Sequence, residues 1–323
     1  MKTRLTEILG IEHPVMLAGM GGVSYAPLVI AVSEAGGFGC LGASTMSTEK
    51  MVAEIAEVRS ATDKPFGVDL LTAMPGDLVA QVELVISGGA SVFVAGLGVP
   101  AEVVELCHRH DVLVVNMCGK VDHARRALEA GCDIVVAQGT EAGGHTGLVA
   151  TMPLVPQIVD AVGADIPVVA AGGIFDGRGL AAALALGADG VWVGTRFIAT
   201  PEARGVAGYK DALVRTKEDG TTISRAFSGK TMRVVRNAYT GFYEEHPGEL
   251  APFPAQLGRS IEDGAFHLGG GEDTLGIDPE RECYPTGQGV GAIQTLMPAA
   301  SIVAQMVDQA ELILAQLGAV GAE

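Results

Sequence analysis

One histidine in a glycine-rich loop is the clearest candidate for chemistry in this chain of 323 residues. The segment 139–146 reads GTEAGGHT and directly follows the apolar run 134–137. Its glycines allow the backbone to approach a flat ligand closely, and His145 can accept or release a proton near neutral pH. The pattern predicts a proton-transferring residue beside a ligand. The simpler alternative is a structural loop histidine.

Glycines also follow two later apolar runs, at Gly172-Gly173 and at Gly194-Thr195. At such strand ends, backbone N–H groups and a helix N-terminus together form a frequent phosphate site. One glycine pair is a weak signal, because pairs occur in ordinary turns, whereas two successive strand ends favour phosphate binding. The glycines of segment 19–22 suit a flat ring. Together these segments predict a planar cofactor that carries phosphate, most simply FMN.

Eight short apolar runs are expected to position these residues as buried parallel strands. The runs lie at 14–18, 38–41, 66–69, 91–94, 113–117, 134–137, 168–170 and 190–193. Helices are expected between them at 25–35, 49–61, 78–87, 101–108, 121–130, 155–162 and 177–186. Glycine just past several of these helices is typical of a C-terminal cap. Eight strand–helix units predict an α/β fold of the (β/α)8 TIM barrel type. A doubly wound open sheet is the alternative.

The pattern changes after Val193, the last residue of the eighth run. Residues 201–283 are richer in charged and turn-forming residues, and the chain becomes helical again from about 289 to 316. We therefore expect residues 1–200 and 284–323 to form the cofactor-binding barrel. Residues 201–283 are expected to form a smaller inserted α+β cap domain that packs on it.

Composition excludes several classes of function. The net charge of −17 argues against nucleic acid and against anionic membranes as partners. The five cysteines show no CxxC spacing, and no His/Cys/Asp set has metal-site spacing, so no metal is expected. The first 14 residues lack the apolar core of an export signal, which favours a cytoplasmic location. Four other histidines are expected to be structural or at the surface, namely His13, His123, His246 and His267.

The order of short motifs resembles the FMN-dependent nitronate monooxygenase (2-nitropropane dioxygenase-like) family, which is related to the FMN-type enoyl-ACP reductases. The matching segments are EHPVM (12–16), AGGFG (35–39), KPFGVD (64–69), EAGGH (141–145), AGGI (171–174), GTRF (194–197), MRVVRN (232–237) and GQG (287–289). No single motif is specific, but the ordered set is. The resemblance covers almost the whole chain.

The resemblance implies an FMN at the strand ends, with His145 as the catalytic group that faces the flavin. Phosphate contacts would come from Gly172, Gly173, Gly194 and Thr195. Contacts along the ring and ribityl chain would come from Met20, Gly21, Asp69, Gln138, Gly139 and Gly144. Candidate substrate contacts are Arg233, Arg236 and Gln288. The two arginines suit an anionic nitronate or the phosphates of NAD(P)H or a CoA-like carrier; the alternative is a structural role, with each paired to a carboxylate.

Two positions depart from the pattern of many relatives. Asp69 stands where many monooxygenases carry Asn, and Met117 stands where some members carry a lysine. An ionised carboxylate cannot donate a hydrogen bond, so Asp69 is either a negative charge near the flavin or a residue held protonated.

The resemblance implies a nitronate monooxygenase that uses O2, with His145 removing the α-proton of a nitroalkane. The alternatives are an NAD(P)H-dependent FMN reductase of an enoyl thioester or quinone, and a non-catalytic flavin-binding protein. A monomer or homodimer acting on a small molecule is expected.

Overall fold

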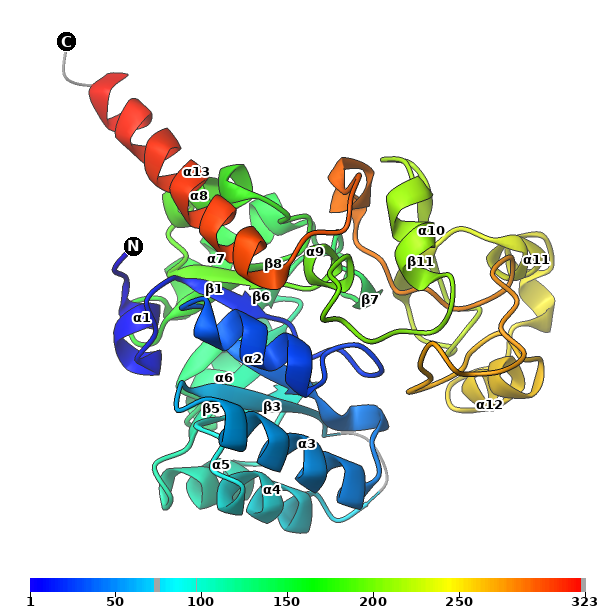
Figure 1. Cartoon of the computed structure of the whole chain (residues 1–323), viewed down its shortest axis with the longest axis horizontal. Helices are drawn as coiled ribbons and strands as arrows, with labels where there is room; N and C mark the ends of the chain where they lie inside the picture. The colour runs from blue at the N-terminus through cyan, green and yellow to red at the C-terminus, as the bar shows by residue number, and fades with distance from the viewer. Residues whose placement is uncertain (73–75, 97, 321–323) are drawn as a thin grey trace.

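The computed structural model describes residues 1–72, 76–96 and 98–320. Eight parallel strands form one sheet, and helices cover its outer face (Figure 1). Neighbouring strands follow the order β1-β9-β8-β6-β5-β4-β3-β2. The strands are β1 (Val15–Leu17), β2 (Gly39–Gly42), β3 (Phe66–Leu71), β4 (Val92–Gly96), β5 (Leu113–Cys118), β6 (Ile134–Gln138), β8 (Val168–Ala171) and β9 (Gly190–Val193). All eight predicted strands are therefore confirmed.

A parallel bridge between Met16 and Phe38 joins β1 to the start of β2 and closes the sheet. The N–H of Leu17 donates to the Phe38 carbonyl at 2.8 Å, and the N–H of Phe38 donates to the Val15 carbonyl at 2.9 Å. A closed sheet has no free edge. This closure confirms the predicted (β/α)8 barrel and excludes the open doubly wound sheet.

The helices between the strands end where the sequence places glycine. Gly36, Gly89, Gly131 and Gly187 have φ angles of 81°, 83°, 88° and 91°, a left-handed conformation that favours glycine. The barrel-side helices are α1 (Arg4–Leu9), α2 (Ala26–Glu34), η1 (Ala43–Thr45), α3 (Thr48–Ala61), α4 (Leu78–Ser87), α5 (Ala101–His108), α6 (Val121–Glu129), α7 (Thr151–Val162), α8 (Gly177–Ala185) and α9 (Thr195–Ile198).

Apolar side chains fill the inside of the barrel. Met16, Phe38 and Trp192 belong to one buried cluster that also contains Leu5 from α1. A Cβ on Gly190, the first residue of β9, would lie 2.4 Å from the Leu5 side chain. Helix α1 therefore packs at the amino-terminal end of the strands. A ligand site is left at the opposite end, where the strands finish.

The segment between β9 and the last helix has a small core of its own. Phe227, Met232, Tyr239 and Tyr243 lie in a separate buried cluster, and Phe227 stacks on Tyr239 with ring centroids 5.1 Å apart. Its elements are α10 (Tyr209–Arg215), β10 (Thr221–Ser224), β11 (Met232–Val235), α11 (Ala238–Glu245), η2 (Pro247–Glu249), α12 (Ala255–Glu262) and η3 (Gln288–Ala292). Helices and strands are mixed here, and the exact cap boundaries stay a prediction.

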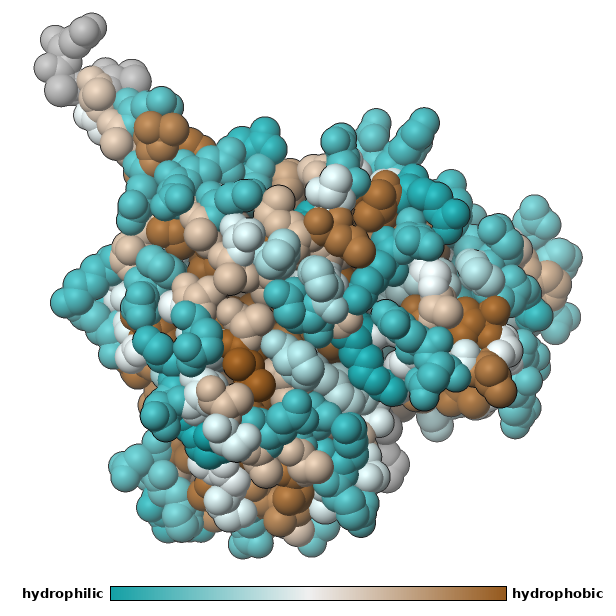
Figure 2. Space-filling view, viewed as in Figure 1, coloured by the Kyte–Doolittle hydropathy of each residue, from teal (hydrophilic) through white to brown (hydrophobic). Residues whose placement is uncertain are grey.

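The chain ends in helix α13 (Ala299–Val320), which packs against α8 and α2 and extends past the barrel (Figure 1). It begins about ten residues later than the sequence predicts, because residues 288–292 form the separate turn η3. Leu312 and Leu317 on its projecting part are each 59% exposed. Figure 2 shows apolar surface along this part of the helix.

Candidate active site

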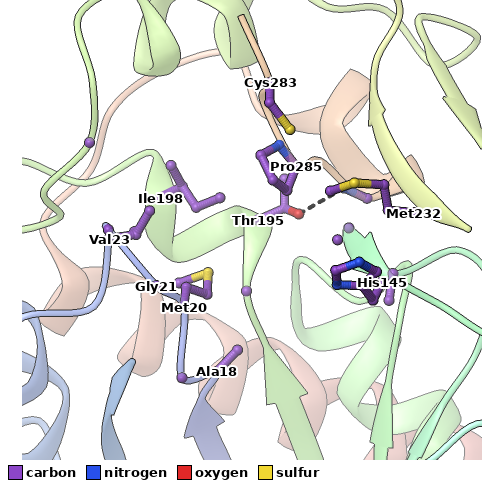
Figure 3. A pocket seen from close by; sticks show the side chains of 18 of the residues that line it. Ala18, Met20, Gly21, Val23, His145, Thr195, Ile198, Met232, Cys283 and Pro285 are labelled. Carbon is purple, nitrogen blue, oxygen red and sulfur yellow. Dashed lines mark hydrogen bonds between the residues drawn. The ribbon is translucent and has the colours of Figure 1, made fainter. Parts of the chain in front are cut away.

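A cavity of about 360 Å³ lies between the carboxyl ends of the barrel strands and the cap segment, a volume within the range of small-molecule sites. Side chains from both parts converge on it (Figure 3). Ten of the predicted site residues line it, namely Met20, Gly21, Asp69, Gln138, Gly144, His145, Gly172, Gly173, Gly194 and Thr195. The structure thus brings the predicted histidine and glycine segments together, although their ligand contacts stay predictions.

The loop that carries His145 is held by the cap. Residues Gly144–His145 form a short strand, β7, that pairs antiparallel with β11, so that His145 lies opposite Met232. The Gln138 side chain donates to the His145 carbonyl at 2.7 Å. The Arg233 guanidinium donates through Nε to the Thr140 carbonyl at 2.9 Å. The catalytic candidate is therefore fixed from both sides of the cavity.

Among the described residues, the His145 ring has one polar partner, the Ser228 hydroxyl, at 2.9 Å from Nε2. Because that hydroxyl donates to the Lys230 carbonyl at 3.2 Å, the ring is satisfied as the Nε2–H tautomer, which leaves Nδ1 free to accept a proton. Burial lowers the pKa of His145 below its usual 6.5, and the charge of Lys230 lowers it further. His145 is thus neutral at pH 7 and able to act as a base.

The two glycine segments form a concave turn with few side chains. Gly172 and Gly173 have φ angles of 106° and 74°, and a Cβ on Gly172 would lie 2.7 Å from the Thr151 hydroxyl. Helix α9 begins beside them at Thr195, and no side chain caps it. Its first N–H groups therefore suit an anion. This geometry fits the predicted phosphate cradle.

Asp69 lies on the wall of the cavity against the strand-one loop. A Cβ on Gly19 would lie 2.2 Å from the Asp69 Cβ, so only glycine leaves room for this carboxyl. Burial raises the pKa of Asp69 to about 8. Of the two forms expected for Asp69, ionised and protonated, the protonated form is therefore favoured at pH 7. The protonated carboxyl can donate a hydrogen bond.

We expect Asp69→Asn to stabilise the protein in alkaline but not in acidic solution. Between about pH 4 and pH 8 the folded protein keeps a proton that the unfolded chain releases, so the free energy of unfolding falls as pH rises. Asparagine removes that fall. At pH 9 the free energy of unfolding of the variant should therefore exceed that of the parent by on the order of 2 kcal/mol, which is less than the full shift in pKa implies because solvent in the cavity screens the ionised carboxyl. Denaturant unfolding at pH 5 and pH 9, with equal cofactor loading, measures the difference. An equal effect at both pH values would contradict the raised pKa.

Four predicted residues lie outside the cavity wall. Gly139 instead packs on α7, where a Cβ would meet the Thr151 hydroxyl at 2.1 Å. Arg233 is buried, and its guanidinium holds the Thr140 carbonyl and the Thr221 hydroxyl, so of the two alternatives the structure favours a structural role, although neither partner is a carboxylate. Arg236 and Gln288 are exposed. The positions of these residues do not support direct ligand contact.

Many residues of the cavity wall were not predicted from the sequence, and three cap residues among the lining and supporting ones bear on the chemistry. Ser228 contacts His145 from a loop of the cap. His267, expected to be structural or at the surface, lines the cavity together with Glu282. No periodic pattern marks these positions, because each acts through a partner that is distant in the sequence: His145 for Ser228, and His267 and Glu282 for one another.

Other predicted absences remain predictions. In the described ranges no group of three or more His, Cys, Asp or Glu residues is placed to hold a metal ion. None of the helices in that part of the chain combines the length and apolar character needed to span a bilayer. The cytoplasmic location and the oligomeric state stay predictions.

The model of the family described as "Nitronate monooxygenase" matches residues 2–78 and 72–309. The chain belongs to the nitronate monooxygenase family. It has the barrel fold of this family and, like its members, is an oxidoreductase.

Two curated relatives illustrate the range of the nitronate monooxygenase family. A "(3aS,4S,5R,7aS)-5-hydroxy-7a-methyl-1-oxo-octahydro-1H-indene-4-carboxyl-CoA dehydrogenase" of Mycobacterium tuberculosis is 43% identical over 73% of this chain and 66% of its own length. A "Probable nitronate monooxygenase" of Staphylococcus haemolyticus is 35% identical over 78% of this chain and 83% of its own length. This chain is therefore similar to proteins that are named for different substrates.

Two solved structures of the family show the same architecture. FabK of Thermotoga maritima has a TM-score of 0.88 and 33% identity, and the match covers 99% of both chains. A nitroalkane oxidase of Streptomyces ansochromogenes has a TM-score of 0.82 and 29% identity, over 97% of this chain and 99% of its own. The barrel and the cap arrangement are thus shared with family members of different names.

Proposed function

We propose that this chain is an FMN-dependent nitronate monooxygenase that oxidises nitroalkanes or alkyl nitronates with O2. The observation that carries the proposal is that one cavity holds a neutral, half-buried His145 and, close by, a glycine cradle, which consists of Gly172, Gly173 and the start of helix α9, where no side chain caps the helix. A neutral imidazole suits removal of a proton next to an electron-withdrawing group. The cradle suits the phosphate of a flavin.

The residues present fit FMN. Gly172, Gly173, Gly194 and Thr195 would hold its phosphate, and the strand-one residues Met20 and Gly21, which line the same cavity, would lie along the ring. FMN, when bound, would supply the acceptor for the substrate's electrons and pass them to O2. Asp69, protonated at pH 7, would donate a hydrogen bond along the cofactor without adding charge.

The chain's own residues would prepare the substrate. Nδ1 of His145 would take the α-proton of a nitroalkane, and Ser228 would hold the opposite ring nitrogen so that the tautomer stays fixed. An alkyl nitronate, which has already lost that proton, would need only to be bound and oriented. The cap segment, which lines the cavity with Met232 and Cys283, would limit the access of water.

A second candidate function is oxidation or reduction of an acyl thioester, with NAD(P)H as a co-substrate in the reductive case. The relative named as a carboxyl-CoA dehydrogenase is the specific observation that favours it, since it is 43% identical to this chain. The same His145 would then exchange a proton with the carbon next to the thioester. The same cavity and histidine suit both nitronate oxidation and thioester chemistry. The two functions are therefore distinguished by which compound donates electrons to the flavin.

We expect the purified protein to be yellow, with oxidised-flavin absorption bands. Anaerobic mixing with ethyl nitronate, NADH or NADPH then distinguishes the candidates: bleaching by the nitronate alone supports the monooxygenase, and fast bleaching by a nicotinamide supports the reductase. A colourless preparation that cannot be reconstituted with FMN would contradict both proposals. A flavin-loaded protein that is reduced neither by these donors nor by a saturated acyl-CoA thioester would support the third alternative, a non-catalytic flavin-binding protein.

A further inference from the structure

A second polar pair lines the cavity, from the cap side. Nδ1 of His267 lies 2.7 Å from the Glu282 carboxylate, whose other oxygen accepts the backbone N–H of His267 at 3.1 Å. The Glu282 side chain is 1% exposed, whereas the His267 side chain is 22% exposed. The carboxylate is thus buried behind the ring, which itself stays partly exposed.

The imidazole is the side-chain partner of this buried carboxyl. Within the described ranges, no lysine or arginine forms an ion pair with Glu282. A buried carboxylate is costly unless it is paired. One proton between Nδ1 and the Glu282 carboxyl, held on either group, satisfies both atoms, and Nε2–H is then the donor of the ring that is left for a ligand.

The backbone holds this pair over the barrel loops. The carbonyls of Gly269 and Gly270, just after His267, accept hydrogen bonds from Arg204 Nη1 at 2.6 and 3.1 Å. A Cβ on Gly22 would lie 3.4 Å from the Gly269 Cα, so the cap segment touches the strand-one loop. Both His267 and Glu282 line the same cavity as His145.

We propose that His267 contacts the substrate, with its Nε2–H donating a hydrogen bond to an oxygen that carries negative charge in the activated substrate, and that Glu282 is its positioning residue. This assignment rests on the proposed function and deepens it. In a nitronate the oxygen belongs to the nitro group, and in a thioester it is the carbonyl oxygen. His145 would then handle the proton, while His267 would hold the oxygen from the cap side.

The test uses His267→Asn in the flavin-loaded protein. The asparagine amide can still donate to Glu282 near the former Nδ1 position, so the buried carboxyl stays paired, but the Nε2 donor is lost. His246→Asn is the matched control, because His246 lies on the same cap, stacks on Phe242 and is not part of the cavity wall. Glu282→Gln tests the positioning role at nearly constant volume.

We expect His267→Asn to lower kcat/KM for ethyl nitronate by roughly 10- to 100-fold, as for the loss of a hydrogen bond to a charged group. Glu282→Gln should lower it less, and His246→Asn should match the parent. Equal kcat/KM for His267→Asn and His246→Asn would overturn the assignment, provided that thermal unfolding shows both variants folded.

A binding measurement separates this assignment from the proposed function. Propionate is an unreactive carboxylate with the shape of ethyl nitronate, and its binding to protein labelled with ¹⁵N-histidine can be followed by NMR without turnover. The Nε2 signal of His267 is identified as the one that is missing from the spectrum of His267→Asn. We expect propionate to shift this signal in the parent protein, and to shift it less in Glu282→Gln. A shift of the His145 signal alone would overturn the role of His267, whether or not nitronates prove to be substrates.

Discussion

Replacing His145 by alanine is expected to lower kcat for nitroalkane oxidation by about 10²- to 10⁴-fold, the usual contribution of a positioned general base. The flavin content should be unchanged, because the glycine cradle lies on other strand ends. Stopped-flow reduction with nitroethane measures the rate of the proton-removal step directly. With ethyl nitronate, which needs no deprotonation, the loss should be much smaller.

Two further observations complete this prediction. His123→Ala is the matched control, because His123 lies on the outer helix α6, away from the cavity. In the parent protein, kcat/KM for nitroethane should fall as pH drops through a value below 6.5, because burial lowers the pKa of His145 and only its neutral form accepts a proton. Full turnover of His145→Ala on every substrate of the parent would show that this histidine is not catalytic.

Gly194→Asp is expected to raise the Kd for FMN by at least about 100-fold. The backbone at Gly194 has a negative φ of −106° and not the left-handed conformation that favours glycine, so the fold should tolerate the change. The new side chain would leave the backbone beside Met20 and Ala18, so its carboxylate would add a negative charge next to the proposed phosphate cradle. Two like charges at about 4 Å repel by several kcal/mol near a protein surface. Fluorescence titration of the apoprotein with FMN gives the Kd.

Gly194→Ala separates charge from size. Its Cβ would meet the Met20 sulfur at 3.3 Å and the Ala18 Cβ at 3.5 Å, contacts that a flexible methionine can accommodate, so FMN affinity should change little. Equal FMN affinity in Gly194→Asp and the parent would place the phosphate elsewhere. An equal loss in both variants would mean that volume rather than charge is the cause.

The barrel is predictable from the sequence because its signals are local. Each strand is a short apolar run, as buried parallel strands require, and glycines such as Gly36 and Gly187 mark the helix ends. The face of the site follows from the fold, since parallel strands place all their carboxyl ends together. His145 and the glycines that follow β8 and β9 therefore line one cavity, while their roles stay predictions.

The cap's contribution is not predictable in this way. Ser228 is 83 residues from His145 in the chain, and Glu282 is 15 residues from His267, so neither partnership has a local pattern. Arg233 looked like a ligand contact because its charge suits an anion, but its guanidinium satisfies backbone and hydroxyl oxygens around the His145 loop. Only the folded structure shows which oxygen a buried arginine meets.

The pairing of β7 with β11 has a consequence for engineering new specificity. Because His145 is hydrogen-bonded into the cap's sheet, a cap exchanged between relatives would carry its own alignment for the histidine. A chimera that takes residues 201–283 alone would leave β7 paired with a foreign strand. Active chimeras should therefore exchange segment 139–150 together with the cap. The loop that carries the proton-transferring histidine and the segment that lines the substrate side of the cavity would then come from the same relative.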